Sequence, residues 1–300
     1  MASECLKPII LGLAILALIG CSAAPPFQAL IHQGSSKALR PGDIIETATG
    51  SVLPFDSLIH NLSKSQIIYI GESHNRPEDH RLQLEVLKGL HARNPGLILA
   101  LEMLPREVQP WLDQYSQGSI SEREFLEKSE WEKNWGYPFD LYRGLFHWAR
   151  ARHLRMIGLN APIEIVNRIA QKGLDSLSPS ERNKVASEFH QDHPEHRAYL
   201  FRQYGHHPQG KIKNFDTFYE AQLAWEETMA ETLSRTVASF SKGDQILVLL
   251  GKGHMIQHLG VPRLTRIRVD HTFQTVLPVS ADYPIRTLEP KPADYIYLTE

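Results

Sequence analysis

The sequence predicts an α/β fold in which a mostly parallel sheet is flanked by helices, with a smaller all-helical subdomain beside it. Short apolar runs alternate with longer stretches of helical period along the chain. The runs are almost continuously apolar, which is typical of strands buried on both faces. They cover residues 67–71, 97–103, 154–160, 245–251 and 265–270.

The all-helical subdomain is predicted from a long block between the third and fourth runs that contains no convincing strand. Within it, "SPSE" places Ser178 as a helix N-cap, Pro179 at the first helical position and Glu181 three residues after the cap. "SERE" at 121–124 is a similar helix start. We expect a helical insertion at about 172–212, with residues 105–137 as a second candidate part of it.

The first residues have the features of a secretion signal. The apolar stretch "PIILGLAILALIG" is too short to span a bilayer as a mature helix, and it runs directly into Cys21. The letters "LIGC" resemble the bacterial lipobox, whose cysteine is lipidated and becomes the new N-terminus. An ordinary signal peptide that happens to contain a cysteine is the alternative. We expect a signal peptide at 1–20, a lipid tether at 21–42 and the folded body at 43–300.

This arrangement predicts a lipid-anchored protein of the bacterial envelope. Cys5 would leave with the signal and Cys21 would carry lipid, so neither cysteine would be free for a disulfide or a metal. Ser22 follows the lipidated position, and in a Gram-negative host the lipoprotein sorting pattern then favours the periplasmic face of the outer membrane. The formal net charge of -2 does not indicate the positively charged surface that is typical of nucleic-acid-binding proteins.

Polar side chains follow four of the predicted strands. "IIYIGESH" ends in Glu72 and His74, and the next three strands deliver Glu102, Asn160 and His254. In open α/β sheets the ligand crevice lies outside the carboxyl ends of the strands. Any one of these residues could simply cap a helix or satisfy backbone groups. Together they predict a polar crevice, in which Glu72, His74, Glu102 and His254 form one hydrogen-bonded cluster because buried carboxylates need partners.

A long helix, "FDTFYEAQLAWEETMAETL", is expected to form the facing wall of this crevice. Gln222 interrupts an otherwise apolar helical stripe, so its amide needs a polar partner. Glu226 lies one turn beyond Gln222, and Tyr219 lies just before it. We expect Gln222 or Glu226 to reach the crevice. The alternative is that Tyr219 and Glu226 are half-exposed surface residues. The apolar members of the stripe are Phe218, Trp225, Met229 and Leu233.

These segments carry a family resemblance. "GESHNRPEDHRLQLE", "ALEML", "LNAP", "FYEAQLAWEETMAE" and "GKGHMIQHLGVP" occur in the order and at roughly the spacing of the ChaN-like haem-binding uptake lipoproteins, within the larger group that includes Tiki and TraB proteins. The resemblance covers about residues 42–279. It implies a large parallel sheet flanked by helices, a small helical domain, and haem held between protomers, as in a homodimer, with a tyrosine on the iron.

The resemblance favours a lipoprotein that holds haem or passes it on during iron acquisition. Tyr219 is the first candidate for the iron because it lies beside Gln222, and Tyr204 is the second. His206 and His207 are expected to bind the propionates, reaching from a second protomer across a two-fold interface. The alternative is that the histidine-rich segment 188–208 is only a solvated helix and loop. The same segment also offers Tyr199, with Arg197 and Arg202 as possible propionate partners.

A metal-dependent hydrolase is the alternative function. Glu72, His74, Glu102 and His254 are oxygen and imidazole donors suited to zinc or manganese, and such a site could activate water. Tiki proteins, which the chain resembles in "GKGHM", are metal-dependent proteases, and erythromycin esterases share the GE-x-H pattern. The glycines of "GKGH" do not make a phosphate loop, since the wider spacing and its Ser/Thr are absent.

Overall fold

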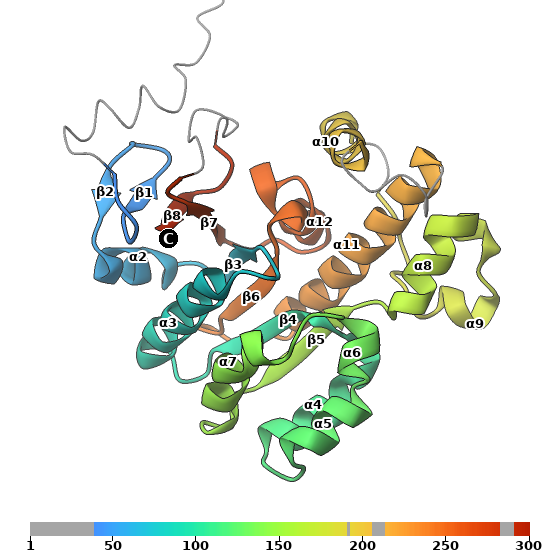
Figure 1. Ribbon diagram of the computed structural model, residues 1–300, viewed down its shortest axis with the longest axis horizontal. Coiled ribbons are helices and arrows are strands. Elements are labelled where there is room, and N and C mark those ends of the chain that lie inside the picture. Colours follow the sequence, from blue (N-terminus) through green and yellow to red (C-terminus); the bar gives the residue numbers. More distant parts are fainter. Residues whose placement is uncertain (1–38, 191–192, 206–213, 283–290) are drawn as a thin grey trace, which may run out of the picture.

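The structure is a computed structural model that describes residues 39–190, 193–205, 214–282 and 291–300. Its centre is a sheet with the strand order β2-β1-β8-β7-β3-β6-β4-β5 (Figure 1). From β8 to β5 neighbouring strands pair in parallel, while β1 pairs antiparallel with β2 and β8. The strands are β1 (Ile44–Glu46), β2 (Val52–Leu53), β3 (Ile67–Glu72), β4 (Ile98–Pro105), β5 (Met156–Asn160), β6 (Ile246–Gly251), β7 (Phe273–Ser280) and β8 (Tyr295–Thr299). The predicted mostly parallel α/β sheet is confirmed.

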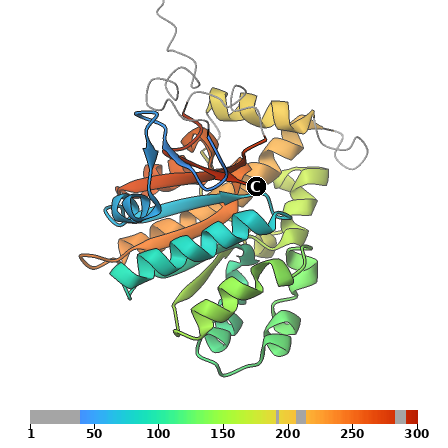
Figure 2. The ribbon, with the colours of Figure 1, turned by 60° about the vertical axis from the view of Figure 1, so that its left-hand side comes forward.

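The pleat of the strands divides the apolar residues between two cores. Ile68 and Ile70 of β3 face one core, whereas Ile67 and Tyr69 face the other. Helices α2 (Phe55–Leu62), α3 (Pro77–Arg93) and α7 (Asp140–Arg150) cover the first face. Helices α11 (Phe215–Ala238) and α12 (Val261–Arg268) cover the second (Figures 1 and 2). Burial on both faces is why these strands read as continuous apolar runs.

Both segments expected to be helical contain helices. Ser121 and Ser178 each form a complete capping box with the glutamate three residues later, as their sequence predicts. Helix α8 packs along α11, and α10 crosses one end of α11 (Figure 2). The helices of the first segment are α4 (Gln109–Ser116), α5 (Glu122–Lys128) and α6 (Trp131–Asn134), and α8 (Ile163–Lys172), α9 (Pro179–Arg182) and α10 (Pro194–Tyr204) lie in and just before the second.

The strand predicted at 265–270 is wrong, because these residues form the end of α12 and the turn after it. "TRIRVD" imitates the alternation of a strand, but Val261, Leu264 and Thr265 are buried at helical spacing and Ile267 is 49% exposed. Pro262 near the start of α12 favours a helix beginning there. The next parallel strand is instead β7, which lies between β3 and β8.

The expected signal peptide, the lipidation site at Cys21 and nearly all of the tether lie outside the described residues. In the part of the chain that the structure describes, every helix is too short or too polar to cross a membrane.

Gly158 in β5 lies against the backbone of β4, so we expect Gly158→Ala to destabilise the fold. A Cβ at Gly158 would lie 2.8 Å from the Pro105 carbonyl oxygen, which belongs to backbone that cannot swing away. Overpacking of this kind costs about 1–3 kcal/mol of unfolding free energy. The matched control is Gly144→Ala in α7, where the Cβ would meet Leu84 at an ordinary 3.7 Å. Urea unfolding should show that this change stabilises by about 0.5–1 kcal/mol. Equal effects at the two positions would contradict the tight approach of β4 to β5.

Candidate functional site

The candidate site lies at the carboxyl ends of β3 and β6, which are parallel neighbours near the middle of the sheet. The helix that follows β3 packs on one face of the sheet and the helix that follows β6 packs on the other. Such a switch point leaves a crevice between the two strand ends, where α/β proteins bind ligands. Glu72, the last residue of β3, pairs in register with Gly251, the last residue of β6.

Glu72 is buried and holds three donors. The Nδ1 of His74 lies 2.8 Å from its Oε1, and the Tyr142 hydroxyl donates to the same oxygen at 2.6 Å. Gln83 in α3 donates its amide to Oε2 at 2.7 Å. The His74 ring also packs 4.6 Å from Trp135, measured between ring centroids. This carboxylate therefore fixes the His74 ring and ties the strand end to α3 and α7.

A second network surrounds His254 on the other face of the sheet. Its Nε2 lies 3.3 Å from Glu102 Oε1, and its Nδ1 lies 3.0 Å from Glu226 Oε1. Glu102 also accepts the backbone N–H of Gly251. The Nε2 of His196 in α10 lies 2.9 Å from Glu226 Oε2, an ion-pair distance without hydrogen-bond alignment. The chain Glu102, His254, Glu226, His196 thus connects β4 to α11 and α10.

The single hydrogen-bonded cluster expected from the sequence is instead two networks. Successive side chains of a strand point to opposite faces, so Glu72 falls on the side of Ile70 and faces α3. Glu102 falls on the side of Ala100 and faces α11. The two networks meet at Gly251 of β6. The expectation that Glu226 reaches the crevice from the long helix agrees with the geometry, and the carboxylate is fully buried.

His254 is an imidazolium at neutral pH. Burial alone would lower its pKa, but the carboxylates of Glu102 and Glu226 outweigh it and raise the pKa to about 10. For Glu226, burial acts to raise the pKa, yet His196 and His254 lower it to about 2. Both nitrogens of His254 are therefore protonated and directed at carboxylates. An imidazolium held in this way has no lone pair with which to accept a proton or bind a metal.

Three glycines let the loop after β6 pack this closely. A Cβ at Gly251 would lie 2.7 Å from the His74 ring, and one at Gly71 would lie 3.2 Å from the Cα of Lys252. At Gly260 a Cβ would overlap the carbonyl of His254. Gly71, Gly251 and Gly260 therefore serve close packing around the two networks.

A cleft of about 290 Å³ opens beside these networks, between α10, α11 and the loop after β6. Tyr199 of α10 faces this loop, since a Cβ at Gly253 would lie 3.6 Å from the Tyr199 hydroxyl. Burial, with the nearby charge of Glu226, raises the pKa of Tyr199 to about 12. Among the described residues the Tyr199 hydroxyl has no hydrogen-bond partner. The lining residues are Glu72, Ser73, His74, Tyr199, Leu200, Gln203, Phe218, Gln222, Gly251, Lys252, Gly253 and His254.

The residues expected around the cofactor divide into several groups. Gln222 lines the cleft, whereas Asn160 bonds its side chain to the backbone of Glu102 and Ala161. Tyr219 is buried beneath α10, where Arg197 stacks on its ring and also pairs with Asp216.

Tyr204 packs against Phe215 and Phe218. It is not among the side chains that line the cleft, although it lies five residues after Tyr199 on the same helix. His206 and His207 lie outside the described residues.

Several residues of the site had no assigned role in the sequence analysis. His196 and Tyr142 hold the carboxylates of the two networks, and neither lies near a strand end in the sequence. Gln83 could have been found, because it lies on the "EDHRLQLE" helix that follows Glu72 directly. Lys252 lies inside the "GKGH" motif but contributes to neither network. The partners supplied by distant helices depend on tertiary packing, for which a single sequence carries no local signal.

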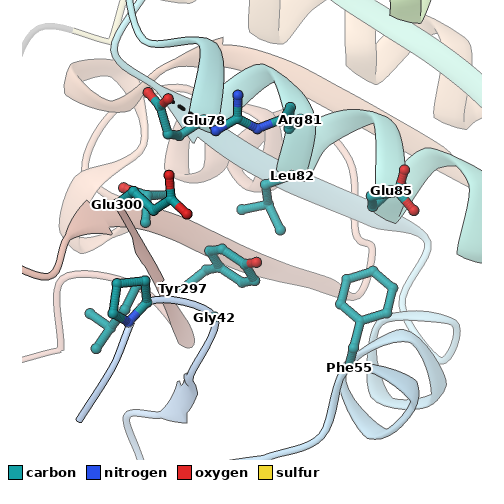
Figure 3. A pocket seen from close by; sticks show the side chains of 11 residues that line it. Gly42, Phe55, Glu78, Arg81, Leu82, Glu85, Tyr297 and Glu300 are labelled. Atoms are coloured by element: carbon teal, nitrogen blue, oxygen red, sulfur yellow. Dashed lines mark hydrogen bonds and ion pairs between the residues drawn. The ribbon is translucent and has the colours of Figure 1, made fainter.

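A larger groove of about 430 Å³ lies elsewhere, between α3, the start of α2 and β8. Figure 3 shows Leu82, Tyr297 and Phe55 around its apolar part, with Glu78, Arg81 and Glu85 on α3. These charges are satisfied by neighbours on their own helix, because Glu78 pairs with Arg81 and Glu85 pairs with Lys88. Among the residues that the structure describes, neither buried network reaches this groove, so it is not the candidate site. In the described part of the chain no group of three or more His, Cys, Asp or Glu is placed to hold a metal ion.

Comparison with known proteins places the chain in a family. The family described as "Haem-binding uptake, Tiki superfamily, ChaN" matches residues 58–264, which is more than half of the sequence. The chain therefore belongs to the ChaN family of haem-binding uptake proteins, as its motifs suggest.

Solved structures agree on the fold. ChaN of Campylobacter jejuni, solved with cofacial haem binding, superimposes with a TM-score of 0.70 at 20% identity, covering 87% of this chain and 98% of that one. A mutant of the erythromycin esterase EreC in its open conformation gives a TM-score of 0.46 at 13% identity, covering 75% of this chain and 72% of that one. The latter similarity is too low to carry an argument about function.

A curated plant protein shares part of the sequence. Protein RETICULATA-RELATED 5, chloroplastic, from Arabidopsis thaliana is 29% identical over 130 residues, which covers 40% of this chain. The match spans only 17% of the length of the plant protein.

The His254 network predicts a pH-dependent stability. The folded-state pKa of His254 is raised from 6.5 to about 10, so its contribution is complete below pH 6.5 and is lost as the pH rises through 10. Between pH 7 and 9 the unfolding free energy of the wild type should fall relative to that of His254→Gln by about 1.4 kcal/mol per pH unit. Urea unfolding at several pH values measures this slope, with exposed His60→Gln as the control. A constant difference across this range would show that His254 is neutral in the folded protein.

Proposed function

We propose that this protein binds one haem per chain in the cleft between α10, α11 and the loop after β6. Membership of the ChaN family supports haem as the ligand. The observation that carries the placement is Tyr199, whose hydroxyl faces the glycine loop inside the cleft. A tyrosine side chain can bind ferric iron once it has lost its proton. Because its pKa is raised, the Tyr199 phenol keeps its proton at neutral pH and would release it only on binding the iron.

The residues of the cleft fit such a ligand. Leu200 and Phe218 supply apolar surface on the helical wall, while Lys252 and His254 alternate with Gly251 and Gly253 on the loop opposite. Ligand pockets combine apolar surface with a few polar groups in this way. When bound, haem would supply an iron centre. The chain itself would supply the phenol of Tyr199, the apolar wall and partial exclusion of water.

The size of the cleft supports a shared site. Pockets that enclose most of a small ligand run from about 300 to 1,000 Å³, so a cleft of about 290 Å³ would cover only part of a haem. A second copy of the chain is the natural cover for the remainder, since a two-fold dimer would bring two such clefts together. His206 and His207 remain the proposed propionate partners from the second protomer.

The networks favour binding over hydrolysis. A hydrolytic site of this kind would need Glu72 or His74 as a base next to a bound water. Glu72 already accepts three donors. Burial acts to lower the pKa of His74, but the hydrogen bond to Glu72 and the charges of Glu102 and Glu72 raise it overall. The polar groups of the strand-end residues therefore bind one another, and these residues shape the cleft.

Substitution of Tyr199 tests the proposal. Titration of purified protein with haemin, followed by absorption in the Soret region, should give a complex with a phenolate-to-iron charge-transfer band. Tyr199→Phe should remove that band and weaken binding at least about tenfold, the scale on which even outer-shell partners of a metal act. Tyr204→Phe and Tyr219→Phe, the two positions expected from the sequence, should be measured in parallel.

The matched control is Tyr297→Phe, which makes the same change in the separate groove of Figure 3 and should leave the titration unchanged. If Tyr199→Phe keeps both the band and the affinity while Tyr204→Phe or Tyr219→Phe loses them, haem binds through another tyrosine. If the wild type binds no haemin, the proposed function is wrong.

We further propose that the protein works as a lipoprotein in haem or iron acquisition, anchored at the periplasmic face of the outer membrane. The support is the lipobox-like "LIGC" ending at Cys21 and the following Ser22. Acyl chains give strong anchorage because the membrane affinity grows with each buried methylene.

Cys21→Ala should abolish acylation and release the protein from membranes or leave it as an unprocessed precursor. Labelling with an alkyne fatty acid and fractionation of cell membranes measure this directly. Cys5→Ala, in the expected signal peptide, should remain acylated and membrane-bound. Normal membrane fractionation of a processed Cys21→Ala protein would contradict the lipid anchor.

A further inference from the structure

The lysine of the "GKGH" motif has no role in either network. Lys252 follows β6 directly, and its Nζ lies 3.0 Å from the hydroxyl of Ser73, which follows β3. No carboxylate lies within ion-pair distance of Lys252 in the described part of the chain. An ammonium group is thus held between two strand ends by a neutral partner, at the carboxyl edge of the sheet.

Lys252 and Ser73 separate two hollows. Both residues line the cleft that contains Tyr199, and both also line a smaller hollow of about 160 Å³ at the ends of β3 and β7. The smaller hollow is lined by both apolar and polar residues. Its other lining residues are Arg76, Asp79, Ile256, Leu277, Pro278, Val279 and Ser280. A group that reaches past Lys252 from the cleft would enter this hollow.

The smaller hollow carries two cations and one carboxylate. Arg76 donates to the backbone carbonyl of Glu300 and lies 3.9 Å from Glu78, a long ion-pair distance. Asp79 is buried, and its Oδ2 accepts the backbone N–H of Ser73 at 2.7 Å. Its charge also acts on Arg76 and Lys252, so the hollow holds two cations against one carboxylate, and the two cations are the groups that can attract an anion.

We propose that Lys252, assisted by Arg76, binds a carboxylate arm of the ligand that occupies the cleft. The proposal rests on the haem function proposed above, and the arm is then a haem propionate. A carboxylate that leaves water needs a charged partner, and a lysine side chain reaches such groups as a mobile point charge. The macrocycle would lie in the cleft while one propionate extends past Ser73 towards the smaller hollow.

Paired changes in the protein and the ligand test this contact. Haemin and its dimethyl ester, in which both carboxylates are neutral, are titrated into wild type and Lys252→Met. The variant should bind haemin about fivefold more weakly, the scale of one partly exposed ion pair. It should bind the dimethyl ester as well as the wild type does. Lys252→Arg should restore most of the haemin affinity because the charge is kept.

Lys88→Met is the matched control, since Lys88 lies on α3 and pairs with Glu85. It should leave both titrations unchanged. Equal haemin affinity of Lys252→Met and wild type would overturn the proposal while leaving haem binding intact. An equal loss for haemin and its ester would also overturn it, because the lysine would then act through the shape of the cleft. Failure of the wild type to bind haemin would instead overturn the proposed function on which the contact rests.

Discussion

The arrangement of the site depends on one buried imidazolium. His254 lies between the carboxylates of Glu102 and Glu226, which belong to a strand and to the long helix of the facing wall. Two buried carboxylates on adjacent elements would repel each other and lose their hydration. The positive charge of His254 offsets that cost, and His196 extends the same chain to α10. The distance between the sheet and the two wall helices, and therefore the width of the cleft, follows from this row of charges.

The same pairing of charges makes the strand-end residues structural and leaves them poorly suited to catalysis. Charged groups that neutralise one another are poorly suited to act on a substrate, because each protonation state is fixed by its neighbour. Glu72, with its three donors, is committed in the same way on the opposite face. Besides these strand-end residues, the cleft is lined by a phenol, an ammonium group, two amides, a hydroxyl and apolar surface. This set suits the binding of a large flat ligand with charged arms.

Much of the fold follows from local sequence signals. Continuous apolar runs marked β3 to β6, and the serines at 121 and 178 marked helix starts, because burial and capping act over a few residues. The segment "TRIRVD" was wrongly predicted to be a strand, because alternating arginines can lie on the exposed side of a short helix as well as on a strand. β1, β2, β7 and β8 were not predicted. β1 and β2 are short strands at one edge of the sheet, and β7 and β8 join them to β3.

The candidate site was predictable in position but not in its internal arrangement. Strand-end geometry placed Glu72, Glu102 and His254 at one edge of the sheet. The pleat of the strands, which is readable from the odd and even positions of each run, then divides them between two faces. The position of α10 is different, because it depends on buried contacts such as His196 with Glu226. For that reason the sequence favoured Tyr219 beside Gln222, whereas the structure brings Tyr199 into the cleft.

A crystal structure of the protein with haemin tests the central claim most directly. The account predicts a macrocycle between α10 and the loop after β6, with the iron bonded to the Tyr199 oxygen and with His254 still between its two carboxylates. Haem bound in the groove around Tyr297, or iron bonded to His254 after loss of the contact with Glu226, would contradict it.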